Sequence, residues 1–151
     1  MAKISYFPPD RASDILVMHH GGIPQYEEHV HDGIELIIAA RGNADHIVNG
    51  RAYPVRQGDV YVINPGTRHG TGNAATLEEC LIAYTPDVLR SLGAPVRTMS
   101  AFHTLFDLAP RTPEAGYACR LHLGRTDLLS ALRRCGRIEE EVTARTDGWR
   151  T

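Results

Sequence analysis

Turn signals divide residues 14–84 into many short apolar segments, and this division constrains the fold more than any other feature of the sequence. The strongest signal is Asn49-Gly50, because a two-residue type I′ hairpin turn needs positive φ at both central positions. Gly58-Asp59 and Asn64-Pro65-Gly66 mark further turns on either side of the strand-like run 60–63. Short strands with turns roughly every 8 to 12 residues are typical of an all-β sandwich or barrel.

The segment 29–42, HVHDGIELIIAARG, carries the most chemistry in this region. Side chains alternate faces in an extended strand, so His29 and His31 are expected on one side. Glu35 follows after a short turn and can rejoin that side if the turn keeps the register. His69 stands after a second turn, in NPGTRHG. Three imidazoles and a carboxylate suit a divalent transition metal (Zn, Ni, Fe or Mn) or a polar binding pocket.

Alternation along the same strand predicts further inward positions. If Glu35 faces inwards, Arg41 does too, and it could bind a carboxylate or hydroxyls of a ligand; the alternative is a solvated residue at a strand end. His46, close to the Asn49-Gly50 turn, has the same two interpretations. His19 and His20 are adjacent, so at most one of them faces inwards. The other predicted inward positions are Ile37 and Ala39, and the outward ones, which helices or a second strand layer should cover, are Leu36 and Ile38.

Composition excludes several other classes of protein. Lysine plus arginine is 16 and aspartate plus glutamate is 18, a formal charge of −2, which argues against this chain wrapping nucleic acid by itself. No apolar run approaches the ~20 residues that span a bilayer, and the N-terminus lacks the apolar core of a signal peptide. The three cysteines have no CxxC spacing and are expected to be reduced core residues. We predict one cytoplasmic domain.

The pattern becomes helical after residue 85. Apolar residues between 128 and 142 recur at steps of three and four, which predicts one face of an amphipathic helix. Such a face can pack on its own barrel or pair with a second copy of the chain. The polar ending TARTDGWRT suggests that the chain is part of something longer. The apolar face consists of Leu128, Leu132, Cys135, Ile138 and Val142.

The spacing of the four polar residues resembles the two sequence motifs of the cupins. HxH, a Glu four residues after the second His and a Gly seven after the Glu match the first motif. In the second motif, this sequence departs by having Asn64 where the family has Pro. Over residues 14–84 the resemblance implies a cupin-type barrel, that is, a double-stranded β-helix. The matches to the second motif are Gly58, Gly66, His69 and Asn73.

With its helical half included, the chain resembles the effector-binding domain of AraC-family transcription regulators. The resemblance implies an N-terminal arm (1–13), a barrel (14–84) and a helical dimerisation segment (85–151) of one domain, with the DNA-binding helix-turn-helix domain absent from this chain. It implies a homodimer through the apolar face of the last helix and a small-molecule effector such as a sugar or carboxylate. The implied effector-binding residues are His29, His31, Glu35, Arg41, His46 and His69.

Alternative functions stay open at this point. His29, His31, Glu35 and His69 could hold one metal ion, or they could be an ancestral remnant that hydrogen bonds to an effector without any metal. A stand-alone metal-dependent cupin enzyme, such as a dioxygenase or isomerase, is the competing hypothesis. Against it, no further acid/base pair or nucleophile constellation accompanies the four residues, so no catalytic residue is predicted. The third hypothesis is a cupin that binds a ligand and has no regulatory partner.

Overall fold

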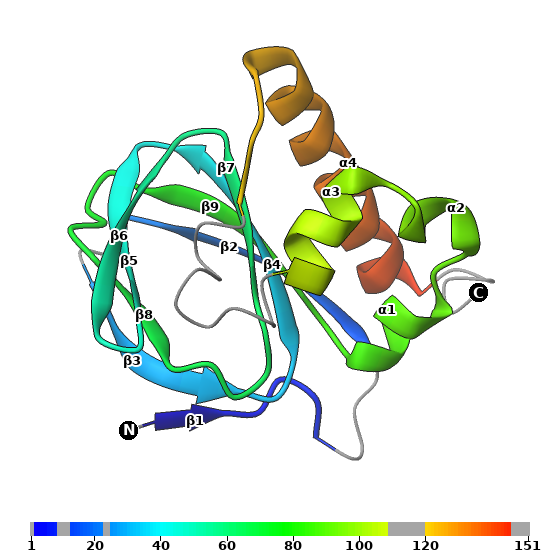
Figure 1. The fold of residues 1–151 in the computed structure, drawn as a ribbon, viewed down its shortest axis with the longest axis horizontal. Helices are drawn as coiled ribbons and strands as arrows, with labels where there is room; N and C mark the ends of the chain where they lie inside the picture. The colour runs from blue at the N-terminus through cyan, green and yellow to red at the C-terminus, as the bar shows by residue number, and fades with distance from the viewer. Residues whose placement is uncertain (1, 9–12, 23–24, 109–119, 146–151) are drawn as a thin grey trace.

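The computed structural model describes residues 2–8, 13–22, 25–108 and 120–145, which form two five-stranded sheets with helices on one side (Figure 1). One sheet has the order β1-β3-β8-β5-β6 and the other β10-β7-β4-β9-β2. Its strands are β1 (Ala2–Ile4), β2 (Ile15–Gly21), β3 (Tyr26–His31), β4 (Ile34–Arg41), β5 (Asn43–Val48), β6 (Arg51–Arg56), β7 (Asp59–Ile63), β8 (His69–Gly72), β9 (Glu78–Tyr84) and β10 (Leu121–His122). The predicted barrel of short strands is therefore present.

Two turns show why glycine stands where it does. Asn49 and Gly50 join β5 to β6 with φ of 51° and 80°, as a type I′ hairpin turn requires. Gly42 joins β4 to β5 with φ of 76°, and a Cβ there would lie 1.9 Å from the carbonyl oxygen of Thr76. Gly42 is therefore required both by its backbone conformation and by the close approach of a neighbouring chain segment.

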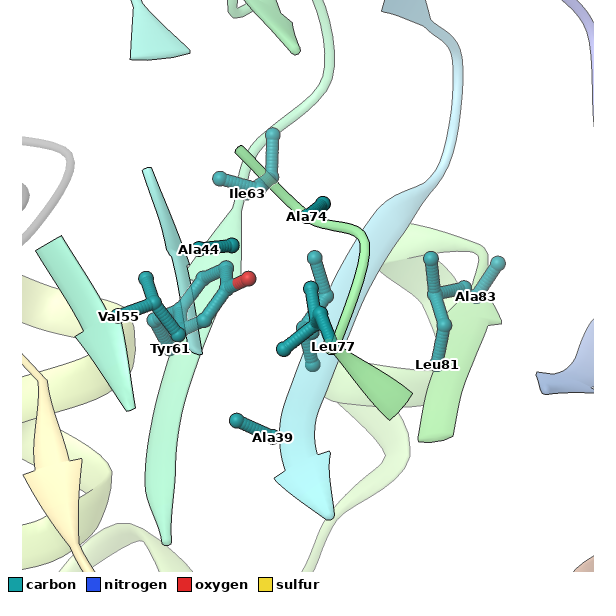
Figure 2. Packing of buried hydrophobic residues seen from close by; sticks show 10 residues of the cluster. Ala39, Ala44, Val55, Tyr61, Ile63, Ala74, Leu77, Leu81 and Ala83 are labelled. Carbon is teal, nitrogen blue, oxygen red and sulfur yellow. The ribbon is translucent and has the colours of Figure 1, made fainter. Parts of the chain in front are cut away.

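Alternation along β4 separates two cores. Ile37 and Ala39 face the space between the sheets, where Ala44, Tyr61 and Leu81 also pack (Figure 2). Leu36 and Ile38 face the opposite side, towards the helices. The predicted parity thus holds up to Ala39, and a register shift between Ala39 and Arg41 then breaks it.

Helices cover the outer face of the β10-β7-β4-β9-β2 sheet (Figure 1). No helix in the described ranges is long and apolar enough to cross a membrane. Cys80 of β9 and Cys135 are free and buried in the core between this sheet and the helices; Cys119 lies outside the described residues. The helices are α1 (Pro86–Ser91), α2 (Ala94–Arg97), α3 (Ser100–Phe102) with the π-helical turn η1 (His103–Leu108), and α4 (Arg125–Ala144).

The apolar face of α4 packs on its own chain. Leu128 and Cys135 are buried against the sheet, and Leu132 and Ile138 are partly buried beside them. Four of the five residues predicted to form a homodimer seam therefore belong to the intramolecular core, because the outer face of the sheet is apolar and needs a cover. Val142 is half-buried near the end of the helix. The homodimer itself stays a prediction, but these residues do not offer a free surface for it.

The N-terminal arm adds a strand to one sheet. Ala2, Lys3 and Ile4 pair in parallel with His29, Val30 and His31 of β3. The rest of the predicted arm is described only over residues 5–8 and 13, and the end of the chain, 146–151, lies outside the described ranges. The arm thus reaches the strand that carries two of the predicted site residues.

Candidate functional site

A cavity of about 240 Å³ lies between the two sheets. This is slightly below the ~300–1,000 Å³ typical of ligand sites, so it suits a small ligand. The wall combines an apolar part with many polar side chains, and its lining residues in the described part of the chain include neither Lys nor Arg. Its lining residues are Ile4, Tyr6, Met18, His20, Tyr26, His29, Glu35, Ile37, His46, Tyr61, His69, Thr71, Glu79 and Leu81.

Strands β3 and β4, which follow each other in the chain but belong to different sheets, and the start of β8 bring four of the predicted site residues together. His29 pairs with His69 across β3 and β8. Glu35 Oε2 lies 3.2 Å from His31 Nε2 and 3.3 Å from His69 Nε2. Ligand atoms of His29, Glu35 and His69 all lie within 4.8 Å of one another. His31 contacts Glu35 without itself lining the cavity.

The backbone fixes the orientation of all three imidazoles. Nδ1 lies 2.8 Å from the Gly33 carbonyl in His31, and 3.0 Å from the Glu27 and Thr67 carbonyls in His29 and His69. A carbonyl oxygen only accepts, so each Nδ1 carries a proton and donates it. In a neutral imidazole this leaves the lone pair on Nε2. Metal-bound histidines almost always donate their other ring nitrogen in this way.

Glu35 is the charged centre of this group and is 1% exposed. Burial alone would raise the pKa of Glu35, but the contacts with His31 and His69 outweigh burial and hold this pKa well below its usual range. Glu35 is therefore a carboxylate, and its Oε2 and the His31 Nε2 are buried atoms that find no hydrogen-bond partner of good geometry among the described residues. Two imidazole nitrogens this close to a carboxylate need a positive charge between them, which protons or a metal ion can supply.

The arm places a further side chain on Glu35. The Tyr6 hydroxyl donates to Glu35 Oε1 at 2.6 Å, and the Tyr6 amide donates to Asp32 Oδ1 at 2.9 Å. Ser5 Oγ donates to the other Asp32 oxygen at 2.5 Å. The Phe7 ring lies so close to Gly33 that a Cβ there would come within 2.7 Å of it. The sequence offered no periodic pattern in the arm that could have revealed the role of Tyr6.

Of the two remaining predicted site residues, His46 lines the cavity and Arg41 does not. His46 is 1% exposed and lines the cavity, with its ring 4.8 Å from Tyr61 and 5.7 Å from His69. Burial lowers the pKa of His46 to about 3, so the imidazole is neutral.

Arg41 does not face the cavity: its side chain is 73% exposed and pairs with Glu78 at 3.3 Å. The bulge after Ala39 turns Arg41 outwards, against the inward direction that alternation predicted, and its role as an effector ligand stays a prediction.

Another group of polar residues lies at the β9 part of the cavity wall. His20 Nδ1 donates to Glu79 Oε1 at 3.2 Å, and the His20 ring lies 5.2 Å from the Tyr26 ring. The neighbouring His19 points the other way and contacts Glu139 of α4 at 3.1 Å. One of the two adjacent histidines thus faces inwards, as alternation requires. The alternate positions Glu79, Leu81 and Ala83 of β9 were a usable signal that sequence reasoning missed.

The model of the AraC-like ligand-binding domain matches residues 13–134 of this chain. This match covers the barrel, the helices α1–α3 and half of α4. The chain belongs to this family. The family assignment, the cupin-type fold and the predicted C-terminal helices are thereby confirmed.

Curated relatives and solved structures add to this picture. The HTH-type transcriptional activator RhaR of Escherichia coli (strain K12) is 35% identical over 65 residues, 43% of this chain and 23% of RhaR, and RhaR of Shigella flexneri serotype 5b gives the same values. The aligned part spans less than a quarter of these relatives. A cupin 2 conserved barrel domain protein from Salinispora arenicola is similar in structure, with a TM-score of 0.43 and 23% identity over 56% of this chain and 76% of that one. A predicted oxalate decarboxylase from Thermotoga maritima has a TM-score of 0.40 and 22% identity over 47% and 64%.

Proposed function

We propose that this chain binds a small-molecule effector in the cavity between its sheets and thereby controls DNA binding by a helix-turn-helix domain of a cytoplasmic regulator. The observation that supports this proposal is a small cavity with converging polar side chains in a domain of this family. An effector can control the regulator only if it binds one arrangement more tightly than another. A homodimer of the regulator is part of the same proposal.

Effector binding is tested by thermal-shift screening of sugars, carboxylates, amines and divalent metals, because binding to the native state raises the melting temperature. His46→Gln changes the buried cavity wall, whereas His103→Gln makes the same exchange on an exposed position of η1. We expect a true effector to lose about tenfold or more in affinity with His46→Gln and nothing with His103→Gln. Equal binding to both variants would place the ligand outside the cavity and overturn the proposal.

Control of DNA binding is tested in the regulator that carries both domains. Coupling between two sites typically changes an affinity by about 5- to 150-fold. We expect the effector to change the affinity for operator DNA by an amount in this range, and His46→Gln to require proportionally more effector. If an effector binds the cavity without changing the affinity for DNA, the chain is a ligand-binding domain that does not control DNA binding through this effector.

We also propose that His29, His31, Glu35 and His69 hold one divalent transition metal. The supporting observation is the backbone hydrogen bond on each Nδ1, which leaves Nε2 as the free donor of each ring; those of His31 and His69 lie beside Glu35, and a ligand atom of His29 lies within 4.8 Å of Glu35 and His69. Nitrogen donors with one carboxylate suit Zn, Ni, Fe or Mn. A bound ion would supply the positive charge that the cluster needs and a Lewis acid that polarises an effector oxygen.

Metal content of chain purified without chelator tests this proposal. We expect about one equivalent of metal, lost with His69→Ala and retained with His19→Ala, which removes an exposed imidazole that faces α4. A metal-free chain that also fails to bind added zinc at micromolar concentration would show that the cluster is held by protons alone.

The same four donors support a second candidate function, a metal-dependent dioxygenase or isomerase. A catalytic metal needs an open coordination position that a substrate can reach, and His29, Glu35 and His69 line the cavity. Family membership favours the regulator. Turnover of a cavity-bound compound by metal-loaded chain, abolished by Glu35→Gln, would favour the enzyme.

A further inference from the structure

The cavity has an acidic wall away from the His–Glu cluster. Glu79 stands opposite Ala39 in the β4–β9 pairing, whereas Glu35 lies four residues earlier on β4. At about 3.3 Å per residue, the two positions are separated by roughly 13 Å along the strand. Glu79 can therefore contact a different part of a ligand from the part that meets Glu35.

Glu79 is a buried carboxylate that keeps hydrogen-bonding capacity. It is 7% exposed, and within the described residues its side chain accepts a hydrogen bond from His20 alone. Glu79 lines the cavity, and its second carboxylate oxygen is not one of the side-chain atoms that are fully buried and lack a partner. A carboxylate offers about four acceptor positions, so most of those of Glu79 remain for a ligand.

The charges around the cavity favour a cation at this wall. Among the described residues, the lining contains the carboxylates of Glu35 and Glu79 and neither Lys nor Arg. A ligand carboxylate beside Glu79 would meet a like charge in a site of low dielectric, whereas a cation would be attracted. A metal ion held by the His–Glu cluster would offset the charge of Glu35, whose position on β4 is roughly 13 Å along the strand from the position that Glu79 faces.

Aromatic rings strengthen this preference. Tyr6, Tyr26 and Tyr61 line the cavity from three different parts of the chain. Tyr26 lies near Glu79, since its ring is 5.2 Å from the ring of His20, which hydrogen bonds to Glu79, and all three residues line one small pocket. Ring faces attract cations, and sites that recognise ammonium groups combine aromatic rings in this way.

We propose that Glu79 and Tyr26 form a subsite for a cationic nitrogen group, so that the effector is a small amine. The proposal rests on the function proposed above and names the chemical class of its ligand. His20 holds one oxygen of Glu79 in place and leaves the other for the ammonium group. A cavity of about 240 Å³ limits the amine to a small compound.

The test uses matched sets of probes that share a carbon skeleton and differ in one functional group. Putrescine, butanediol and succinate form one set, and tyramine, tyrosol and hydroxyphenylacetate form another. Thermal shift and calorimetry with the whole chain measure binding of each. We expect the amine of a set to bind at least tenfold more tightly than its alcohol or carboxylate. Carboxylates or alcohols that bind as tightly as the amines, or amines that do not bind at all, would overturn the proposal.

Two variants locate the subsite. Glu79→Gln removes the inward charge, and Glu78→Gln removes the charge of the neighbouring, outward-facing residue that pairs with Arg41. We expect Glu79→Gln to weaken amine binding about tenfold or more, as loss of a charged hydrogen bond does, and Glu78→Gln to leave it unchanged. Equal effects of both variants would overturn the assignment. If Glu79→Gln fails to fold, the preference of the unaltered chain for amines over the matched alcohols and carboxylates still tests whether the cavity binds a cationic group.

Failure of this subsite and failure of the proposed regulator are distinguishable. A carboxylate or sugar that binds with dependence on His46 would retain the effector cavity and reject the amine. An amine that binds with dependence on Glu79 and leaves operator affinity unchanged would retain the subsite and reject the regulatory role.

Discussion

The Tyr6 hydroxyl donates to Glu35 Oε1 at 2.6 Å, so the N-terminal arm is hydrogen bonded to the charged centre of the site. Asp32 receives two further hydrogen bonds from the arm, one from Ser5 and one from the Tyr6 amide. The buried carboxylate thus has one oxygen towards the imidazoles and the other towards the arm. Stability of the arm and charge of the site are linked through this one residue.

Tyr6→Phe should lower the free energy of unfolding by about 1.5–3 kcal/mol, because it removes a hydrogen bond to a charged, buried acceptor. Tyr84→Phe is the matched control: burial raises the pKa of Tyr84, but within the described residues its hydroxyl makes no hydrogen bond. We expect a loss below about 1 kcal/mol there. Urea denaturation measures both, and equal losses would contradict a special role for the Tyr6–Glu35 contact.

Removal of metal should destabilise the chain if the His–Glu cluster is a metal site. Free zinc at a thousand times its dissociation constant stabilises the native state by about 4 kcal/mol. We expect a chelator to lower the melting temperature of zinc-loaded chain, and to have no effect on Glu35→Gln, which lacks the anionic ligand. A chelator effect of the same size in both proteins would locate the metal elsewhere.

The His20–Glu79 pair should make stability depend on pH in a defined direction. The hydrogen bond to Glu79 raises the pKa of His20 above its ordinary 6.5 in the folded chain, although burial opposes the shift. A raised folded pKa gives stability that is fully present below the unfolded value of 6.5 and is lost as pH rises through the folded value.

Glu79→Gln should therefore cost about 1 kcal/mol more at pH 6 than at pH 9, measured by denaturation without added metal. Glu139→Gln is the control, because its partner His19 belongs to an exposed pair with 56% and 44% of the side chains accessible. Exposed pairs contribute little, so we expect no comparable pH dependence. A larger effect of Glu79→Gln at high pH would reverse the sign and contradict the assignment.

Comparing Gly42→Ala with Gly50→Ala separates two contributions to the loss of stability, a steric clash and an unfavourable backbone conformation. Both glycines have positive φ, but a Cβ would meet the Thr76 carbonyl at position 42 and nothing within 4 Å at position 50. We expect Gly50→Ala to cost about 1 kcal/mol from conformation and Gly42→Ala about 3 kcal/mol or more, since overpacking adds to it. Thermal denaturation measures both, and similar losses would mean that the β4–β5 turn can shift.

Leu128 and Leu129 test which face of α4 carries stability. Leu128 is 5% exposed and Leu129 is 52% exposed. Leu128→Ala should cost about 2–5 kcal/mol, independent of protein concentration, because the contact is intramolecular. Leu129→Ala should cost less than about 1 kcal/mol. A Leu128→Ala effect that diminishes with increasing protein concentration would show that this face serves association instead.

Local rules predicted the central part of the site. Strand alternation placed His29 beside His31, and the even spacing across a short turn returned Glu35 to the same side. The same rule failed at Arg41, because a bulge changes parity and leaves no signal in composition there. Alternation also explains the opposite directions of His19 and His20.

Contacts that depend on sheet order were beyond sequence reasoning. Tyr6 reaches Glu35 because β1 adds to β3, and Glu79 reaches the cavity because β9 lies between β4 and β2. Neither pairing follows from spacing along the chain. The α4 face was predicted correctly as amphipathic, but its partner could be either its own sheet or a second chain until the packing was known.

The bonds from each imidazole Nδ1 to a carbonyl two residues away have an evolutionary consequence. The main chain holds one nitrogen of each ring, so apart from Glu35, which lies against His31 and His69, the orientation of the rings does not depend on a hydrogen bond from a cavity side chain. Cavity residues such as Thr71, Leu81 and Glu79 can therefore be exchanged one at a time without disturbing the donors. A scaffold of this kind can acquire a new ligand by single substitutions while its inherited His–Glu centre persists.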